Sequence, residues 1–135
     1  MFDTKVALVV REDLAVWQKL NVAAFLATGI AAEVPRALGE PYEDAAGRRY
    51  ARMLGQPMLV FVGGLDALRA ARRKALERGL LVVPYVRAMF STGHDAANRE
   101  VFRADDADEP DLVGLALHGP RKDVDKAVKG LALHG

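Results

Sequence analysis

Short apolar runs alternate with segments of helical period along this chain, and the alternation limits the folds it can adopt. The apolar runs, each short enough for one buried strand, are residues 5–10, 58–62, 80–86 and 112–117. The segments that repeat apolar residues at three- and four-residue steps are 21–34, 65–78 and 123–129. This pattern predicts a three-layer α/β/α domain with helices on both faces of a mixed, largely parallel sheet of about four strands.

Other segments give weaker signals. Residues 42–54 are predicted to form a short helix, and residues 131–133 a tail strand. Residues 89–110 show neither period, so they are expected to form a long functional or mobile connection. Pro84 interrupts the run 80–86 and removes a donor from it, which indicates an edge strand or a bulge.

Composition narrows the class of protein. With 135 residues of which 51% are hydrophobic, the chain is expected to be a single domain over 1–135. The absence of cysteine excludes disulfides and thiolate metal sites. Because no signal peptide or membrane-length apolar segment is found, a cytoplasmic protein with no membrane association is expected. The formal charge of +1 argues against a typical nucleic-acid module.

Several motifs have simpler structural interpretations than functional ones. The Gly63-Gly64 pair lacks the spacing of a phosphate-binding loop and predicts a tight turn. The acidic run 105–111 lacks the glycine and glutamate of a calcium loop, so it predicts a solvated loop. Three scattered histidines give no zinc spacing, and we expect neither metal nor cofactor. The repeated Gly-Leu-Ala-Leu-His-Gly at 114–119 and 130–135 predicts two strand-like segments.

Basic residues on the segment 65–78 leave two alternatives open. Arg69, Arg72 and Arg73 share one helical face and could contact phosphate groups. A solvated outer face of the helix explains the same pattern and is the favoured interpretation.

A first candidate site lies at the expected start of the helix in 21–34. Asn21 is predicted as its N-cap, because an Asn side chain accepts from free amides of the first turn. Lys19, two residues earlier, would add a cation to those amides and to the helix dipole. Together they predict a place for an anion or a developing oxyanion, although a solvated surface lysine is an equal alternative.

A second group of candidates lies in residues 91–99. His94 could act as a general base near neutral pH, with Asp95 or Asn98 orienting polar partners. Thr92 adds a hydroxyl beside them. Because neighbours in sequence do not automatically face one another, an ordinary polar loop is the favoured alternative.

Four short segments together resemble peptidyl-tRNA hydrolase II, a small α/β enzyme. They are Lys-Val-Ala-Leu-Val-Val-Arg-Glu-Asp-Leu at 5–14, Lys-Leu-Asn-Val-Ala-Ala at 19–24, Gly-Leu at 79–80 and Leu-Ala-Leu-His-Gly-Pro at 115–120. The resemblance covers most of the chain. It implies a mixed four-stranded sheet between helices, and Lys19 as the counterpart of one of two lysines that open the family's first helix.

The departures from that family bear on activity. The second lysine corresponds to Asn21, and Phe-Leu-Ala-Thr at 25–28 replaces a polar stretch. Arg87 stands where the family has an aspartate proposed to take part in hydrolysis, which reverses the local charge. In these altered motifs the chain resembles an uncharacterised bacterial branch of the superfamily.

Two functions follow from these residues. The first is a binding module that keeps an anion pocket at the first helix N-terminus, with activity unknown and Arg87 attracting a negative ligand. The alternative is a hydrolase of peptidyl-tRNA or a related acyl-nucleotide ester, with Lys19 holding the oxyanion and His94 activating water. The ligand would be an anionic small molecule or tRNA-like, contacted by Asn21, Arg87, Thr92, Asp95 and Asn98. Self-association as a homodimer is also expected.

Overall fold

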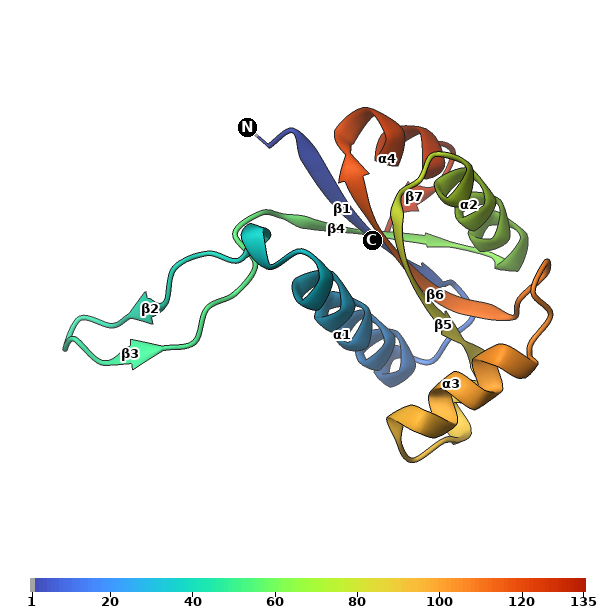
Figure 1. Ribbon diagram of the computed structural model, residues 1–135, viewed down its shortest axis with the longest axis horizontal. Helices are drawn as coiled ribbons and strands as arrows, with labels where there is room; N and C mark the ends of the chain where they lie inside the picture. Colours follow the sequence, from blue (N-terminus) through green and yellow to red (C-terminus); the bar gives the residue numbers. More distant parts are fainter. Residues whose placement is uncertain (1) are drawn as a thin grey trace.

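The first strand lies at the centre of a five-stranded sheet in the computed structural model, which describes residues 2–135 (Figure 1). The sheet contains β1 (Thr4–Arg11), β4 (Met58–Gly63), β5 (Leu81–Val86), β6 (Leu112–Pro120) and β7 (Ala132–Leu133). A separate two-stranded sheet contains β2 (Tyr42–Glu43) and β3 (Arg49–Tyr50). The helices are α1 (Val16–Glu33), α2 (Leu65–Glu77), α3 (Asp95–Ala104) and α4 (Arg121–Ala127), with short 3₁₀ turns η1 (Pro35–Ala37) and η2 (Arg87–Ser91).

The α/β class is confirmed, but the sheet is mostly antiparallel, so the expectation of a largely parallel sheet is wrong. Its strand order is β5-β6-β1-β4-β7, and only β1 and β4 pair in parallel. The chain crosses from β1 to β4 through α1 and from β4 to β5 through α2. These three strands therefore run in one direction, as β-helix-β connections require. The sheet is mixed because β6 inserts between β5 and β1 and runs against both.

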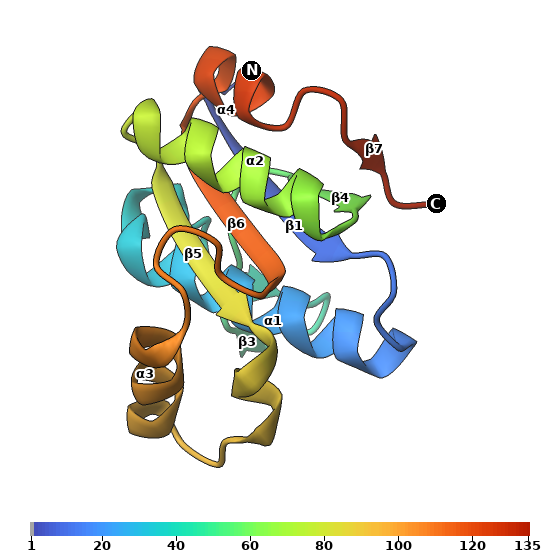
Figure 2. The ribbon, with the colours of Figure 1, turned by 90° about the vertical axis from the view of Figure 1, so that its right-hand side faces the viewer.

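Helices cover both faces of the sheet (Figure 2). The side chains of Val6, Leu8 and Val10 pack with α1, whereas Ala7 and Val9 pack with α2 and α4 on the opposite face. The small residues of α1 let it approach the sheet closely. A Cβ atom added to Gly29 would lie 2.7 Å from Val83, and one added to Gly114 would lie 2.2 Å from Val22.

Residues 42–54 do not form the predicted helix. They belong to a hairpin that reaches out from the body beyond the end of α1 (Figure 1); we call residues 38–55 the arm. At its tip, Asp44 Oδ1 accepts hydrogen bonds from the amides of Ala46 (2.9 Å) and Arg48 (3.0 Å). Gly47 adopts a positive φ of 84°, which glycine tolerates and which ends any helical path.

Residues 89–110 contain a helix that the sequence did not predict. The missing signal has a physical cause, because α3 has no fully buried residue and therefore needs no continuous apolar stripe. After α3 the chain returns to β6 through the acidic segment 105–111. Hydrogen bonds from α2 and from within the segment hold this loop.

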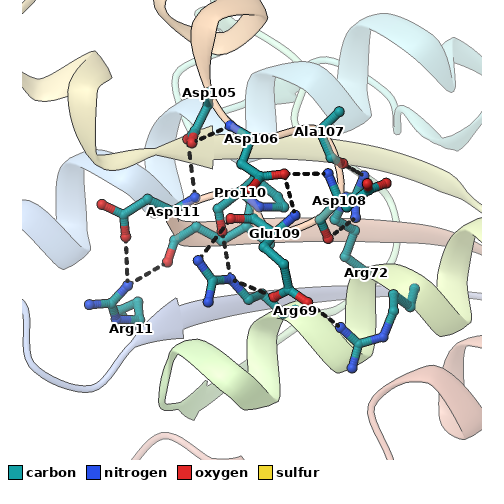
Figure 3. Close-up of polar contacts among 12 residues, drawn as sticks. Arg11, Arg69, Arg72, Asp105, Asp106, Ala107, Asp108, Glu109, Pro110 and Asp111 are labelled. Carbon is teal, nitrogen blue, oxygen red and sulfur yellow. Dashed lines mark hydrogen bonds and ion pairs between the residues drawn. The ribbon is translucent and has the colours of Figure 1, made fainter.

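The acidic loop is held by α2 (Figure 3). Arg69 donates to the carbonyls of Pro110 (2.9 Å) and Glu109 (2.8 Å), and Arg72 donates to the carbonyl of Ala107 (2.6 Å). The Asp106 carboxylate accepts from two amides within the loop itself. Arg69 and Arg72 thus bind their own chain, so neither of the two alternatives set out for these arginines, phosphate contact or a solvated face, describes them.

The two copies of Gly-Leu-Ala-Leu-His-Gly both contribute strands, as predicted. The first lies in the buried strand β6, and the second places β7 beside β4 at the sheet edge, where Leu133 pairs with Phe61. Their histidines consequently differ: His118 is only 5% exposed, while His134 is exposed.

Among residues 2–135, none of the helices has both the length and the apolar character needed to cross a bilayer.

His118 is a buried base without a partner for one ring nitrogen. It lies opposite Val6 on the α1 face of the sheet, and its Nε2 makes no hydrogen bond. Burial, and then the positive charge of Arg36, lower the pKa of His118. The folded protein therefore favours the neutral ring.

A pH dependence of stability follows from His118. Since the folded state resists protonation, the unfolded chain binds more protons as the pH falls below about 6.5, the usual histidine value, and stability declines. We expect the unfolding free energy from urea titration to fall between pH 7.5 and 5.5, and to fall less in His118→Leu. The exposed His134→Leu is the control, and equal slopes in all three proteins would contradict the assignment.

The hydrogen bonds from Arg69 to the acidic loop, which we call the loop clamp, give a second prediction. Arg69→Met should lower the unfolding free energy by roughly 1–3 kcal/mol, because it leaves two carbonyls without a charged donor. Arg73→Met should change the unfolding free energy by less than about 0.5 kcal/mol. Arg73 is half exposed, and its distance of 3.9 Å from Glu109 is long for an ion pair. Chemical denaturation of both variants measures the difference. Equal losses would mean that the two carbonyl bonds are not what holds the loop.

Candidate ligand-binding cleft

A cleft of about 570 Å³ opens between α1, β5, η2 and α3. Five of the seven residues predicted from the sequence as site residues line it: Asn21, Thr92, His94, Asp95 and Asn98. The other two, Lys19 and Arg87, are not part of its lining. The structure thus brings the polar residues of 91–99 together with Asn21, from the distant helix α1.

Aromatic rings form the walls of the cleft. The Trp17 and Phe90 rings meet edge to face at 6.0 Å between centroids, and Phe90 continues to Tyr85 at 5.4 Å. Phe25 extends the wall from Tyr85 at 6.2 Å. Trp17 remains 63% exposed, so much of its surface is available to a ligand.

Sequence reasoning missed this wall, although a signal was present. Trp17, Asn21 and Phe25 recur every four residues, which places them on one side of α1. The resemblance to peptidyl-tRNA hydrolase II identifies Phe-Leu-Ala-Thr at 25–28 as the replacement of a polar stretch. In the structure, this replacement supplies part of the aromatic wall.

Asn21 and Tyr85 form a polar pair in the cleft. The expectation that Asn21 caps the helix is wrong, because α1 begins at Val16 and Gln18 Oε1 accepts from the amide of Ala15 (3.0 Å). Asn21 instead donates through Nδ2 to the Tyr85 hydroxyl at 3.3 Å. Burial raises the pKa of Tyr85, so the phenol keeps its proton at neutral pH. Its O–H and the Asn21 carbonyl oxygen offer one donor and one acceptor.

His94 closes one side of the cleft as the N-cap of α3. Its Nδ1 accepts from the amide of Ala97 at 3.2 Å. The neutral ring must then carry its proton on Nε2, which makes this nitrogen a donor. A role as general base conflicts with that arrangement, because the one lone pair of the neutral ring is already engaged.

The remaining polar residues of the segment stabilise the approach to α3. Thr92 donates to the carbonyl of Met89 (3.0 Å) and contacts the Asn98 side chain. Asp95 forms an ion pair with Arg99 one turn later on the same helix. This pairing offsets the charges of both residues, so this rim of the cleft has little net charge.

Lys19 lies away from the cleft because it points from a different side of α1 than Trp17 and Asn21. Its Nζ is 3.0 Å from His134 Nε2 in the C-terminal tail. His134 Nδ1 lies 2.8 Å from the carbonyl of Gly135 and donates to it, so Nε2 accepts from the lysine. The expected meeting of Lys19 with His94 in one pocket is thus not found.

Arg87 takes part in a charged cluster at the end of the sheet. It lies 3.5 Å from Asp111 and 3.9 Å from Asp13. The buried Arg11 contacts both carboxylates and donates to the carbonyl of Leu112 at 2.8 Å. Two acidic partners compensate Arg87, so it does not present the free positive charge that the sequence suggested.

Within residues 2–135, no three histidine or acidic side chains gather to hold a metal ion.

Comparisons with known proteins give a family but no activity. The profile of a family described as "Protein of unknown function (DUF2000)" matches residues 4–135. A solved structure of a protein of unknown function from Agrobacterium tumefaciens strain C58 is similar, with 50% identity, full coverage of both chains and a TM-score of 0.96. No curated protein matches the chain.

The cap of α3 is open to a direct test. His94→Ala should lower the local stability of α3 by roughly 0.5–2 kcal/mol, because the Ala97 amide loses its acceptor. His94→Asn should restore most of the loss, since an Asn side chain also accepts at an N-cap. Amide hydrogen exchange measures this, with α2 as the internal reference. Unchanged exchange in α3 of the alanine variant would contradict the capping role.

Proposed function

Because this chain belongs to the DUF2000 family of proteins of unknown function, we propose its function from the cleft: it binds a small molecule with a flat heteroaromatic ring. The observation that carries the proposal is the continuous aromatic wall from Trp17 through Phe90 and Tyr85 to Phe25. Stacking of a base on one aromatic side chain contributes about 1–3 kcal/mol. A planar ring therefore gains more from this wall than a flexible chain does.

The polar groups suit the edge of such a ring. The Tyr85 hydroxyl can donate, the Asn21 oxygen can accept, and His94 Nε2–H can donate from the rim. A few directed polar groups in an apolar site set the orientation of a ligand. A nucleobase presents donors and acceptors side by side on a flat ring, so a nucleoside is the chemical class we propose. Because Asp95 and Arg99 offset each other, any phosphate would stay outside in solvent.

A second proposal retains the resemblance to peptidyl-tRNA hydrolase II, with hydrolysis of a peptidyl-tRNA or acyl-nucleotide ester. The observation that favours it is the contact between Lys19 and His134, which places an amine and an imidazole together at the surface. An anion attracted to this pair would lie near the first turns of α1. Turnover of an acylated tRNA by the unmodified protein, lost in Lys19→Ala, would favour hydrolysis over binding alone.

Trp17 provides the readout for the first proposal, since it is the single tryptophan of the chain and lines the cleft. We expect its fluorescence to change saturably with at least one of adenosine, guanosine, cytidine and uridine, but not with ribose. Phe90→Ala should weaken the affinity about tenfold, because stacking of that size is lost. Phe2→Ala, an exposed ring outside the cleft, is the matched control. No saturable change with any of the four nucleosides would exclude this ligand class.

A further inference from the structure

The arm has a defined shape but little of its own chain to pack against. Its base is closed by hydrogen bonds from the Gly39 amide to Met53 (2.8 Å) and from the Gly55 amide to Ala37 (2.7 Å). Beyond the base, Tyr42, Tyr50 and Met53 are all more than half exposed. Figure 1 shows this hairpin extending free of the body. An isolated two-stranded hairpin is marginally stable in water, so this shape requires a surface to rest on.

The arm pairs four of its six charged residues internally, whereas the exposed Glu40 and Arg52 form no ion pair within residues 2–135, so its net charge is zero. Arg48 lies 2.8 Å from Asp44 and Arg49 lies 3.9 Å from Glu43, while Tyr50 donates to Asp44 at 2.8 Å. The uncharged surface that the arm offers to a partner is that of Tyr42, Tyr50 and Met53. A surface without charge is the complement that such a group requires, because an unpaired charge would lose its hydration there.

The outer side of α1 is such a surface. No charged residue occurs from 20 to 32, although a solvated helix face ordinarily carries several. On this side Val16 is 73% and Leu20 is 67% exposed, and Ala24 follows one turn later. A contiguous exposed apolar patch on a protein of this size marks an interaction site.

Length and position connect the arm to this helix. From the base to the tip at Ala46, eight extended residues reach about 26 Å, and the 18 residues of α1 span about 27 Å. The arm begins where α1 ends, after η1. If two copies pack with their α1 helices antiparallel, each arm comes to lie over the N-terminal half of the partner helix, at Val16 and Leu20.

We infer that the arm and the outer side of α1 form the interface of a symmetric homodimer, in which each arm lies along α1 of the second copy. A two-fold axis produces both contacts at once, because both surfaces belong to every chain. A stable complex buries roughly 800 Å² per partner, an area that the two arm–helix contacts and the central pair of helices would share. The second copy is the occupant because it supplies both the neutral arm and the neutral helix at matching lengths.

Sedimentation equilibrium tests the inference on the full chain. We expect a species of twice the 14.6 kDa chain mass, and at least a tenfold weaker dimer in Leu20→Glu. Tyr42→Ser should weaken it in the same way from the arm side. The matched control is Leu76→Glu, which places the same charge on α2, at a side chain 53% exposed. Circular dichroism checks that every variant folds.

A cross-linking experiment locates the contact. Since the chain has no cysteine, Leu20→Cys and Tyr42→Cys proteins can be mixed and oxidised without side reactions. We expect a disulfide between the two variants, and none when Leu76→Cys replaces Leu20→Cys. A monomeric natural protein overturns the inference. A dimer that is insensitive to both Leu20→Glu and Tyr42→Ser, or cross-links that form equally with Leu76→Cys, overturns it as well.

Discussion

Burial of β1 on both faces is the constraint from which the rest of the architecture follows. Val6 to Val10 are at most 3% exposed, so each face of this strand must be covered by a separate layer. The helix α1 supplies one layer, and α2 with α4 supplies the other. A two-layer fold would leave one face of β1 in water, at a cost of about 1.5–3 kcal/mol for each valine or leucine side chain. The position of α1 is fixed in turn, because glycines at 29 and 114 let it lie directly against the sheet.

The insertion of β6 between β5 and β1 determines where the cleft lies. Because β6 runs against its neighbours, the chain must reverse between β5 and β6 rather than cross a face of the sheet. The reversal places η2 and α3 beyond the end of β5, next to α1. Aromatic residues from three elements, Trp17 of α1, Tyr85 of β5 and Phe90 of η2, therefore meet there. At the other end of the connection from β5 to β6, the hydrogen bonds of Arg69 fix the loop that precedes β6.

The sequence predicts whatever depends on a periodic apolar face, and it fails where other forces act. The four main strands, α1, α2 and the tail strand follow from such periods. In contrast, α3 buries nothing completely, and the arm has a chance helical spacing of Tyr42, Ala46 and Tyr50 that the Asp44 turn overrides. For the site, polar residues of 91–99 were found because they cluster in sequence. The roles of Asn21, Lys19 and Arg87 depend on partners at Tyr85, His134 and Asp111, and no local pattern reveals contacts that distant.

The composition of α1 connects the two proposals. Three sides of this helix face different surroundings: Val22, Leu26 and Ile30 face the sheet, Trp17 and Phe25 line the cleft, and Val16 and Leu20 face outward. A helix with one side in water gains solubility from charged residues at no cost to packing, so natural selection ordinarily places them there. None occurs between Lys19 and Glu33. That absence is unexpected for a monomer with an empty cleft, and it is expected when a ligand covers one outer side and a second copy covers the other.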